Sequence, residues 1–173
     1  MTDSQKSGEQ AGDREADLHE VHLLEVPVGL WAKAQEQTDG LLREFALAAD
    51  LADAEALDRH LPTRLTALIE ALNTKFAGVS SEQEQQLFAA AGAGQSVIED
   101  LVYLVPGAAA EASQALGDML DEADVFCREG NHLLTLAAEP DVVAFRWWYL
   151  RQFIDQVAGA EPVPWPAVEA AAP

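Results

Sequence analysis

Cysteine and basic residues are scarce in this sequence, and each shortage excludes a class of protein. Cys127 is the single cysteine in 173 residues, so no intrachain disulfide can form and a reducing cytosol is the expected compartment. Ten lysines and arginines stand against 30 acidic residues, which leaves a net charge of −20. A field of that sign repels phosphate groups, so neither nucleic acid nor an anionic membrane is expected as a partner.

Long apolar runs and a secretory leader are also missing. No apolar run approaches the roughly 20 residues that a bilayer-spanning helix needs. The polar, acidic beginning lacks the basic and apolar blocks of a signal peptide. Hydrophobic residues nevertheless make up 49% of the chain, which suffices to bury a core at this length. The composition therefore predicts an acidic, cytoplasmic protein with one folded domain.

The two ends differ from the middle in composition. Residues 1–17 carry hardly any apolar residues and are predicted to form a disordered acidic arm. Residues 159–173 hold four prolines and a run of alanines, which predicts an extended tail with Trp165 as the residue expected to dock. The single folded domain is therefore expected over residues 18–158.

Helical periodicity dominates the middle of the chain. Apolar residues recur there every three or four positions, which predicts five amphipathic helices. The helices are expected over residues 27–49, 62–76, 80–94, 107–127 and 140–157. Ser81 and Glu84 have the spacing of a capping box at the start of the third helix, in which each side chain binds the other residue's backbone amide.

Three shorter stretches, rich in valine, leucine or aromatic residues, are predicted to be strands. They are residues 19–26, 97–105 and 132–137, and each lies just before a proline, namely Pro27, Pro106 and Pro140. Proline cannot donate to a strand ladder and its fixed φ suits the first turn of a helix, so each proline is expected to end a strand and start a helix.

These elements predict an α+β fold that is mostly α, with about five helices and a sheet of up to three short strands. The three strand–proline–helix segments also suggest an internal repeat. The alternative architecture is an all-α bundle, since the second strand could instead be helical.

Residues that could carry chemistry are few, and each has a simpler interpretation. His19 and His22 are one residue too close for the zinc-binding H-E-x-x-H pattern, and they lie in a predicted strand. Cys127 and His132 could form a thiolate–imidazole pair, but no third orienting group is recognisable, so a buried structural thiol is expected. Neither a metal nor a cofactor is therefore predicted.

Two features with acidic residues also give no reason to predict a metal or a cofactor. The run from Asp121 to Asp124 is predicted to be a solvated helix face, and the alternative is that one of its carboxylates pairs with Arg146 or Arg128. Glu70 and Asn73 superficially resemble the Mg²⁺–ATP helix of histidine-kinase-like ATPases. They stand three residues apart, however, where that motif requires four.

The segment from Phe145 to Phe153 is the most informative stretch. On a helical wheel Phe145 and Trp148 project away from the apolar stripe of their helix, near Gln152. Aromatic residues favour binding hot spots, so these three residues, together with Trp165, are the candidate partner-binding site. The alternatives are a helix that is central to the fold, or a Trp148 that the proline-rich tail covers.

Three segments resemble a group of small actinobacterial proteins of uncharacterised function. They are HEVHLLEVPVGLWAKAQEQTDGLLREFAL, LGDMLDEADVFCREGNHLLTLA and PDVVAFRWWYLRQFIDQVAG, and the resemblance extends over residues 19–166. Relatives of that group are often encoded beside anti-sigma-factor ATP-binding kinases, which implies a role in sigma-factor partner switching. The stretch HLLTLAAEPDVVAFRWWYL also resembles the strand–proline–helix opening of those kinases. The resemblance carries over no catalytic residue.

We therefore expect a non-enzymatic regulatory protein that binds a protein partner through a basic or apolar surface of that partner. One alternative is a degenerate ATP-binding, kinase-like module. Another is a small-molecule sensor whose pocket is lined by Trp31, Tyr103 or Trp147. A homodimer that uses Phe145 and Trp148 as its own interface is the remaining alternative.

Overall fold

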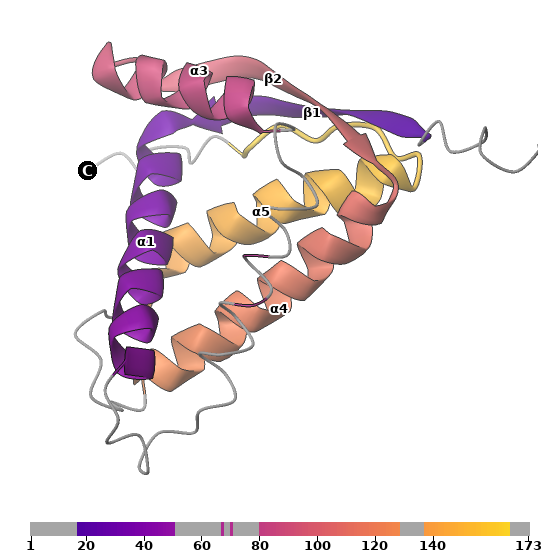
Figure 1. Ribbon diagram of the computed structural model, residues 1–173. Helices are drawn as coiled ribbons and strands as arrows, with labels where there is room; N and C mark the ends of the chain where they lie inside the picture. The colour runs from indigo at the N-terminus through magenta and orange to yellow at the C-terminus, as the bar shows by residue number, and fades with distance from the viewer. Residues whose placement is uncertain (1–16, 51–66, 68–69, 71–79, 129–136, 167–173) are drawn as a thin grey trace, which may run out of the picture.

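The computed structural model describes residues 17–50, 67, 70, 80–128 and 137–166. Within them the fold is α+β and mostly helical, as predicted (Figure 1). The elements are β1 (Leu18–Pro27), α1 (Val28–Asp50), α3 (Ser81–Gly92), β2 (Val97–Pro106), α4 (Ala108–Arg128) and α5 (Pro140–Val157).

Most of the predicted elements are confirmed. The first two strands and the helices that correspond to α1, α3, α4 and α5 lie within a few residues of their expected bounds. The predicted helix over 62–76 and the predicted strand over 132–137 lie almost entirely outside the described residues. Pro27 and Pro106 are the last residues of β1 and β2, and Pro140 is the first residue of α5. Each of these prolines therefore lies at the end of a strand or the start of a helix, as expected from its missing N–H.

The prediction of a capping box at the start of α3 is wrong. The residue that precedes the helix is Ser80, and its side chain makes no bond to a backbone amide. The Ser80 hydroxyl instead donates to the Glu84 carboxylate at 3.0 Å. The helix therefore begins one residue earlier than a Ser81 cap requires, and the two side chains bind each other.

β1 and β2 pair as an antiparallel, two-stranded sheet although more than 60 residues separate them in the sequence. Alternate residues point inward, and Val21 and Leu23 lie opposite Tyr103 and Leu101. The alternation inverts at Glu25, which has a positive φ of 57°. Glu25 is exposed and the next residue, Val26, is fully buried, so this local twist brings a further valine into the core.

Glutamine side chains occupy the unpaired edges of the sheet. The Gln156 amide of α5 accepts from the His22 N–H at 2.9 Å and donates to the His22 carbonyl at 2.7 Å. On the other edge, Gln83 of α3 donates to the Val102 carbonyl at 2.6 Å. These bonds satisfy backbone groups that a two-stranded sheet leaves open, which protects the edges from pairing with another chain.

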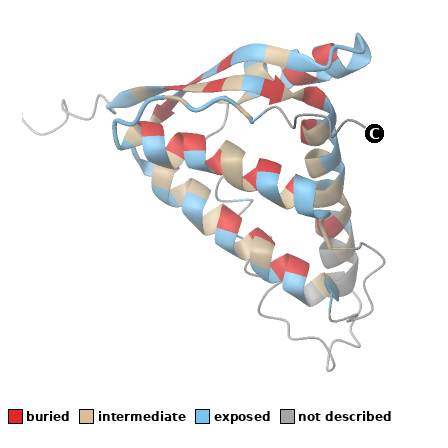
Figure 2. Cartoon of the chain, turned by 180° about the vertical axis from the view of Figure 1, so that it is seen from behind, coloured by how far each residue is buried: buried red, intermediate tan, exposed pale blue. Residues whose placement is uncertain are grey.

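The helices bury the inner face of the sheet. α5 packs against β1, α1 and α4, while α3 packs against β2 and α1 (Figure 1). Figure 2 shows buried positions on the strands and along the facing sides of α4 and α5. The core consists of inward residues of the sheet together with Trp31, Leu87, Phe145 and Phe153. In the part of the chain that the structure describes, no helix is both long and apolar enough to cross a membrane.

The outer face of the sheet carries a histidine between two carboxylates. Nδ1 of His22 lies 3.0 Å from Asp100, and Nε2 lies 2.8 Å from Glu20. The hydrogen bond to Asp100, followed by that to Glu20, raises the pKa of His22 above its usual value of 6.5. The protonated ring can thus bridge the two strands.

This arrangement predicts that stability depends on pH. Because the folded state raises the pKa of His22, its contribution is complete below about pH 6.5 and disappears as the pH rises through the higher folded pKa. We expect the free energy of unfolding to fall by less than about 1 kcal/mol over this range, since the group is partly exposed to solvent. Denaturant titrations at a series of pH values measure this fall, and His22→Gln and Asp100→Asn should each reduce it. An unchanged pH dependence in both variants would refute the bridge.

Candidate functional site

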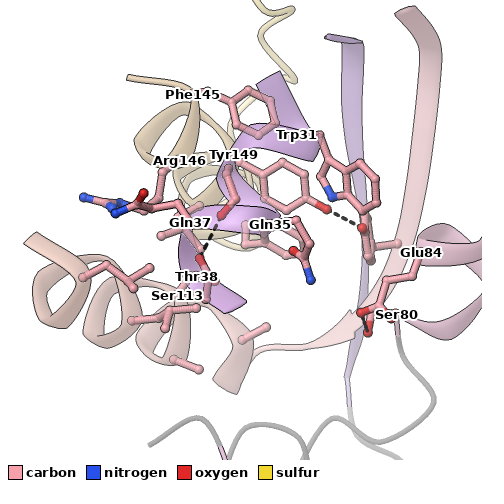
Figure 3. Close-up of a pocket in the computed structure, with 18 of the residues that line it drawn as sticks. Trp31, Gln35, Gln37, Thr38, Ser80, Glu84, Ser113, Phe145, Arg146 and Tyr149 are labelled. Carbon is pink, nitrogen blue, oxygen red and sulfur yellow. Dashed lines mark hydrogen bonds between the residues drawn. The ribbon is translucent and has the colours of Figure 1, made fainter. Parts of the chain in front are cut away.

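A cavity of about 550 Å³ lies between α1, α3, β2, α4 and α5 (Figure 3). Its lining combines aliphatic, aromatic and polar side chains, and we call it the aromatic cavity after the aromatic residues in that lining. The aromatic residues that line it are Trp31, Tyr103, Phe145, Tyr149 and Phe153. Trp31 and Tyr103 were predicted from sequence as pocket residues, whereas the predicted Trp147 is not among the lining residues and packs against Gly117 of α4 instead.

Two tyrosine hydroxyls meet at this cavity. Tyr103 of β2 and Tyr149 of α5 share a short hydrogen bond. Burial raises the pKa of Tyr103 to about 12 and that of Tyr149 well above its usual value, so both hydroxyls stay protonated at neutral pH. Only one hydrogen is used between two hydroxyls. No acceptor for the second hydroxyl hydrogen is found among the described residues.

Several other polar residues that line the cavity already take part in hydrogen bonds or ion pairs. Thr38 donates to the Ala34 carbonyl of its own helix at 3.0 Å, and Glu84 accepts from Ser80. Arg146 donates to Asp124 at 2.8 Å and also to Asp121. Among the described lining residues, the exposed charge that remains is the carboxylate of Glu84, which disfavours an anionic ligand.

The described lining residues include few groups that transfer protons near neutral pH. Among its described residues there is no histidine, cysteine or lysine to act beside the serine and threonine hydroxyls. The Ser80 hydroxyl donates to the Glu84 carboxylate, but no further group that would orient this pair is found among the described lining residues. The lining thus combines apolar side chains with the hydroxyl pair of Tyr103 and Tyr149.

A second candidate site also includes Phe145. The extended residues 160–166 fold back along α5, and Trp165 packs edge-on against Phe145 and Trp148, at centroid distances of 5.6 and 5.4 Å. Trp148 Nε1 donates to the Val163 carbonyl at 2.9 Å, and the Val163 N–H donates to Gln152 Oε1 at 3.1 Å. We call the surface of Phe145, Trp148, Gln152 and the adjoining β1 edge the tail groove.

The four candidate residues from the sequence therefore come together, but not as an open patch. Phe145 is 2% exposed and Gln152 is 4% exposed, so the prediction that Phe145 projects away from the core is wrong. Phe145 belongs to the core cluster, and Trp165 docks against it as predicted. The two alternatives, a central helix and a Trp148 covered by the tail, together describe α5.

The interpretation of the acidic run also needs correction. Asp124 is 2% exposed and pairs with Arg146, so this part of α4 is not a solvated face. Its other oxygen accepts from the Ala138 N–H at 2.9 Å, which ties the start of α5 to α4. The predicted alternative, a pair with Arg146, is the observed arrangement. The hydrogen bond from Trp147 to Asp121 adds to this contact.

Those of the remaining candidates that the structure describes do not come together as a reactive centre. Burial raises the pKa of the Cys127 thiol to about 11, which keeps it protonated and unreactive at neutral pH. His132 and Asn73 lie outside the described residues. In the described parts of the chain, no three histidine, cysteine or acidic side chains gather in a way that could hold a metal ion.

Comparison with known proteins adds no relative. No protein family, curated protein or solved structure matches this chain. The resemblance to small actinobacterial proteins near anti-sigma-factor kinases therefore stays a prediction, and the functional argument depends on the geometry of the two sites.

Proposed function

We propose that this protein is a non-enzymatic ligand-binding protein, which holds a small, largely apolar molecule in the aromatic cavity. The observation that carries this proposal is the Tyr103–Tyr149 hydroxyl pair in the wall of a largely apolar cavity of about 550 Å³. This corresponds to the sensor alternative from the sequence. Regulation of a protein partner, which the sequence also predicts, stays a proposal, and a surface for it is argued in the next section.

The size and lining of the cavity define the ligand class. Pockets for organic ligands usually measure about 300–1,000 Å³ and combine apolar walls with a few well-placed polar groups. The aromatic cavity, at about 550 Å³, falls in that range. The hydroxyl donor favours a ligand with a carbonyl or ether oxygen, and Glu84 disfavours a negative charge. We therefore expect an uncharged or cationic molecule with an aromatic or aliphatic body.

Filling the cavity should abolish binding. Ala112 lines the cavity on α4, so Ala112→Phe should place a ring in the space that the ligand needs. We expect the affinity for the uncharged fluorescent probe N-phenyl-1-naphthylamine to fall by at least about tenfold. The probe's fluorescence in a titration measures this. Ala108→Phe is the matched control, because Ala108 is an exposed residue one turn away on the same helix and does not line the cavity.

The hydroxyl pair needs a separate test, because either tyrosine alone can still donate to the ligand. The double variant Tyr103→Phe with Tyr149→Phe keeps both rings and removes both donors. We expect an aromatic ketone to lose about fivefold in affinity, since one hydrogen bond contributes about 1 kcal/mol, and the hydrocarbon of the same shape to lose none. If the wild-type protein binds neither compound at its solubility limit, with a normal melting curve, the proposed function is wrong.

A further inference from the structure

We propose that the tail groove is a recognition site for an extended, proline-flanked tryptophan segment of a partner protein, and that residues 160–166 of the chain occupy this site in the absence of the partner. This inference rests on contacts of α5 and β1 with residues 160–166 and is independent of the aromatic cavity's ligand.

The groove binds the tail mainly through its backbone. Trp148 and Gln152 bind the two backbone groups of Val163, and the Trp165 N–H donates to the Leu24 carbonyl at 3.0 Å. The side chain of Val163 is 59% exposed and contributes no selectivity. A different extended segment could therefore make the same three hydrogen bonds.

Selectivity comes from the tryptophan and the prolines. The Trp165 ring packs against Phe145 and Trp148, and aromatic contacts of this kind add about 0.5–1.5 kcal/mol beyond area burial. Prolines at 162, 164 and 166 restrict the backbone to extended conformations, so little entropy is lost when such a segment docks. Recognition of proline-rich segments by aromatic grooves follows the same logic.

Two residues of the groove are held by contacts that do not involve the tail. Gln152 is held in place by a hydrogen bond of 3.0 Å from Gln156, and Gln156 is fixed in turn by the His22 backbone. Phe145 is anchored in the core. Release of the tail would therefore leave a preformed site, which lowers the cost of binding a replacement.

The negative charge of this protein indicates which residues should flank the tryptophan segment of the partner. The protein carries a net charge of −20, and Glu161 and Asp155 lie exposed in and beside the tail. Basic residues next to the proline–tryptophan core would be attracted by this field, whereas the chain's own segment is acidic. The expected partner segment is thus a Pro-x-Pro-Trp-Pro type sequence with lysine or arginine before it.

The test uses full-length protein and labelled peptides, with binding read as fluorescence anisotropy. The first peptide has the sequence of residues 160–166, and the second replaces its glutamate with lysine. We expect Trp165→Ala protein to bind both peptides, and wild-type protein to bind them at least about tenfold more weakly, because its own tail competes at high effective concentration. The lysine peptide should bind more tightly at low salt.

Two further variants keep this test decisive. Gly159→Val should detach the tail without altering the groove, because Gly159 has a φ of +93° that is strained for valine. If Trp165→Ala fails to fold, Gly159→Val is used in its place. Trp148→Phe, added to either variant, should weaken peptide binding because the Nε1 donor is lost. Absence of peptide binding to a folded, tail-released variant would overturn the proposal, as would equal binding of a peptide with alanine in place of tryptophan. A dimer that exchanges tails would also overturn it, because a second copy would then be the occupant.

Discussion

Arg146→Met is expected to destabilise the protein by about 3–5 kcal/mol, the usual cost of removing one partner from a buried ion pair. Arg146 is 8% exposed, and its guanidinium donates to Asp124 at 2.8 Å. Methionine preserves much of the packing of the side chain, but it leaves the buried Asp124 carboxylate without a cation. Urea denaturation at neutral pH measures the loss.

A double variant separates charge from packing. Asp124→Asn retains an oxygen that can accept from the Ala138 N–H and removes the buried charge. Combined with Arg146→Met it should recover most of the lost stability, since replacing both members of a buried pair is often close to neutral. If Arg146→Met alone melts like the wild-type protein, the pair does not hold α4 against α5.

Gly117→Val is the second substitution for which we expect a large effect: it should lower the free energy of unfolding by about 3 kcal/mol. A Cβ at Gly117 would lie 2.6 Å from Trp147 Cη2, well inside van der Waals contact. The indole cannot easily move away, because its Nε1 donates to Asp121 at 2.8 Å and Arg151 lies over its ring. Thermal unfolding measures the effect as a lower melting temperature.

The control for this prediction is another helical glycine. A Cβ at Gly92, in the last turn of α3, meets nothing within 4 Å, so Gly92→Ala should be neutral or slightly stabilising. Trp147→Phe, which shortens the ring, should recover part of the stability lost in Gly117→Val. A Gly117→Val protein as stable as the wild type would show that α4 and α5 do not approach each other this closely.

Local signals predicted the elements, but they did not predict which sides of α5 are buried. The predicted bounds of α5, residues 140–157, agree with the structure because proline at the start and helical periodicity act locally. A helical wheel assumes one buried side, whereas α5 is contacted by α4, β1, α1 and the tail. Phe145 therefore appeared to be a surface residue although it lies in the core.

The candidate sites were predictable in part. Aromatic side chains and the proline-rich tail drew attention to Phe145, Trp148, Gln152 and Trp165, and these residues do come together. The Tyr103–Tyr149 pair could not be predicted, because the two residues come from β2 and α5, and no local pattern links them. The same holds for Gln156, which looks like a solvent-facing residue and instead occupies the edge of β1.

The sequence by itself determined the acidic character of this protein, its helices and strands, and the prolines that separate them, because each depends on composition or on neighbours within a few residues. Only the tertiary structure decided which aromatic residues enclose a cavity, which carboxylate is buried against Arg146, and where the tail docks. Those outcomes depend on contacts between segments far apart in the chain, whose relative positions are set by packing and hydrogen bonding in the whole fold.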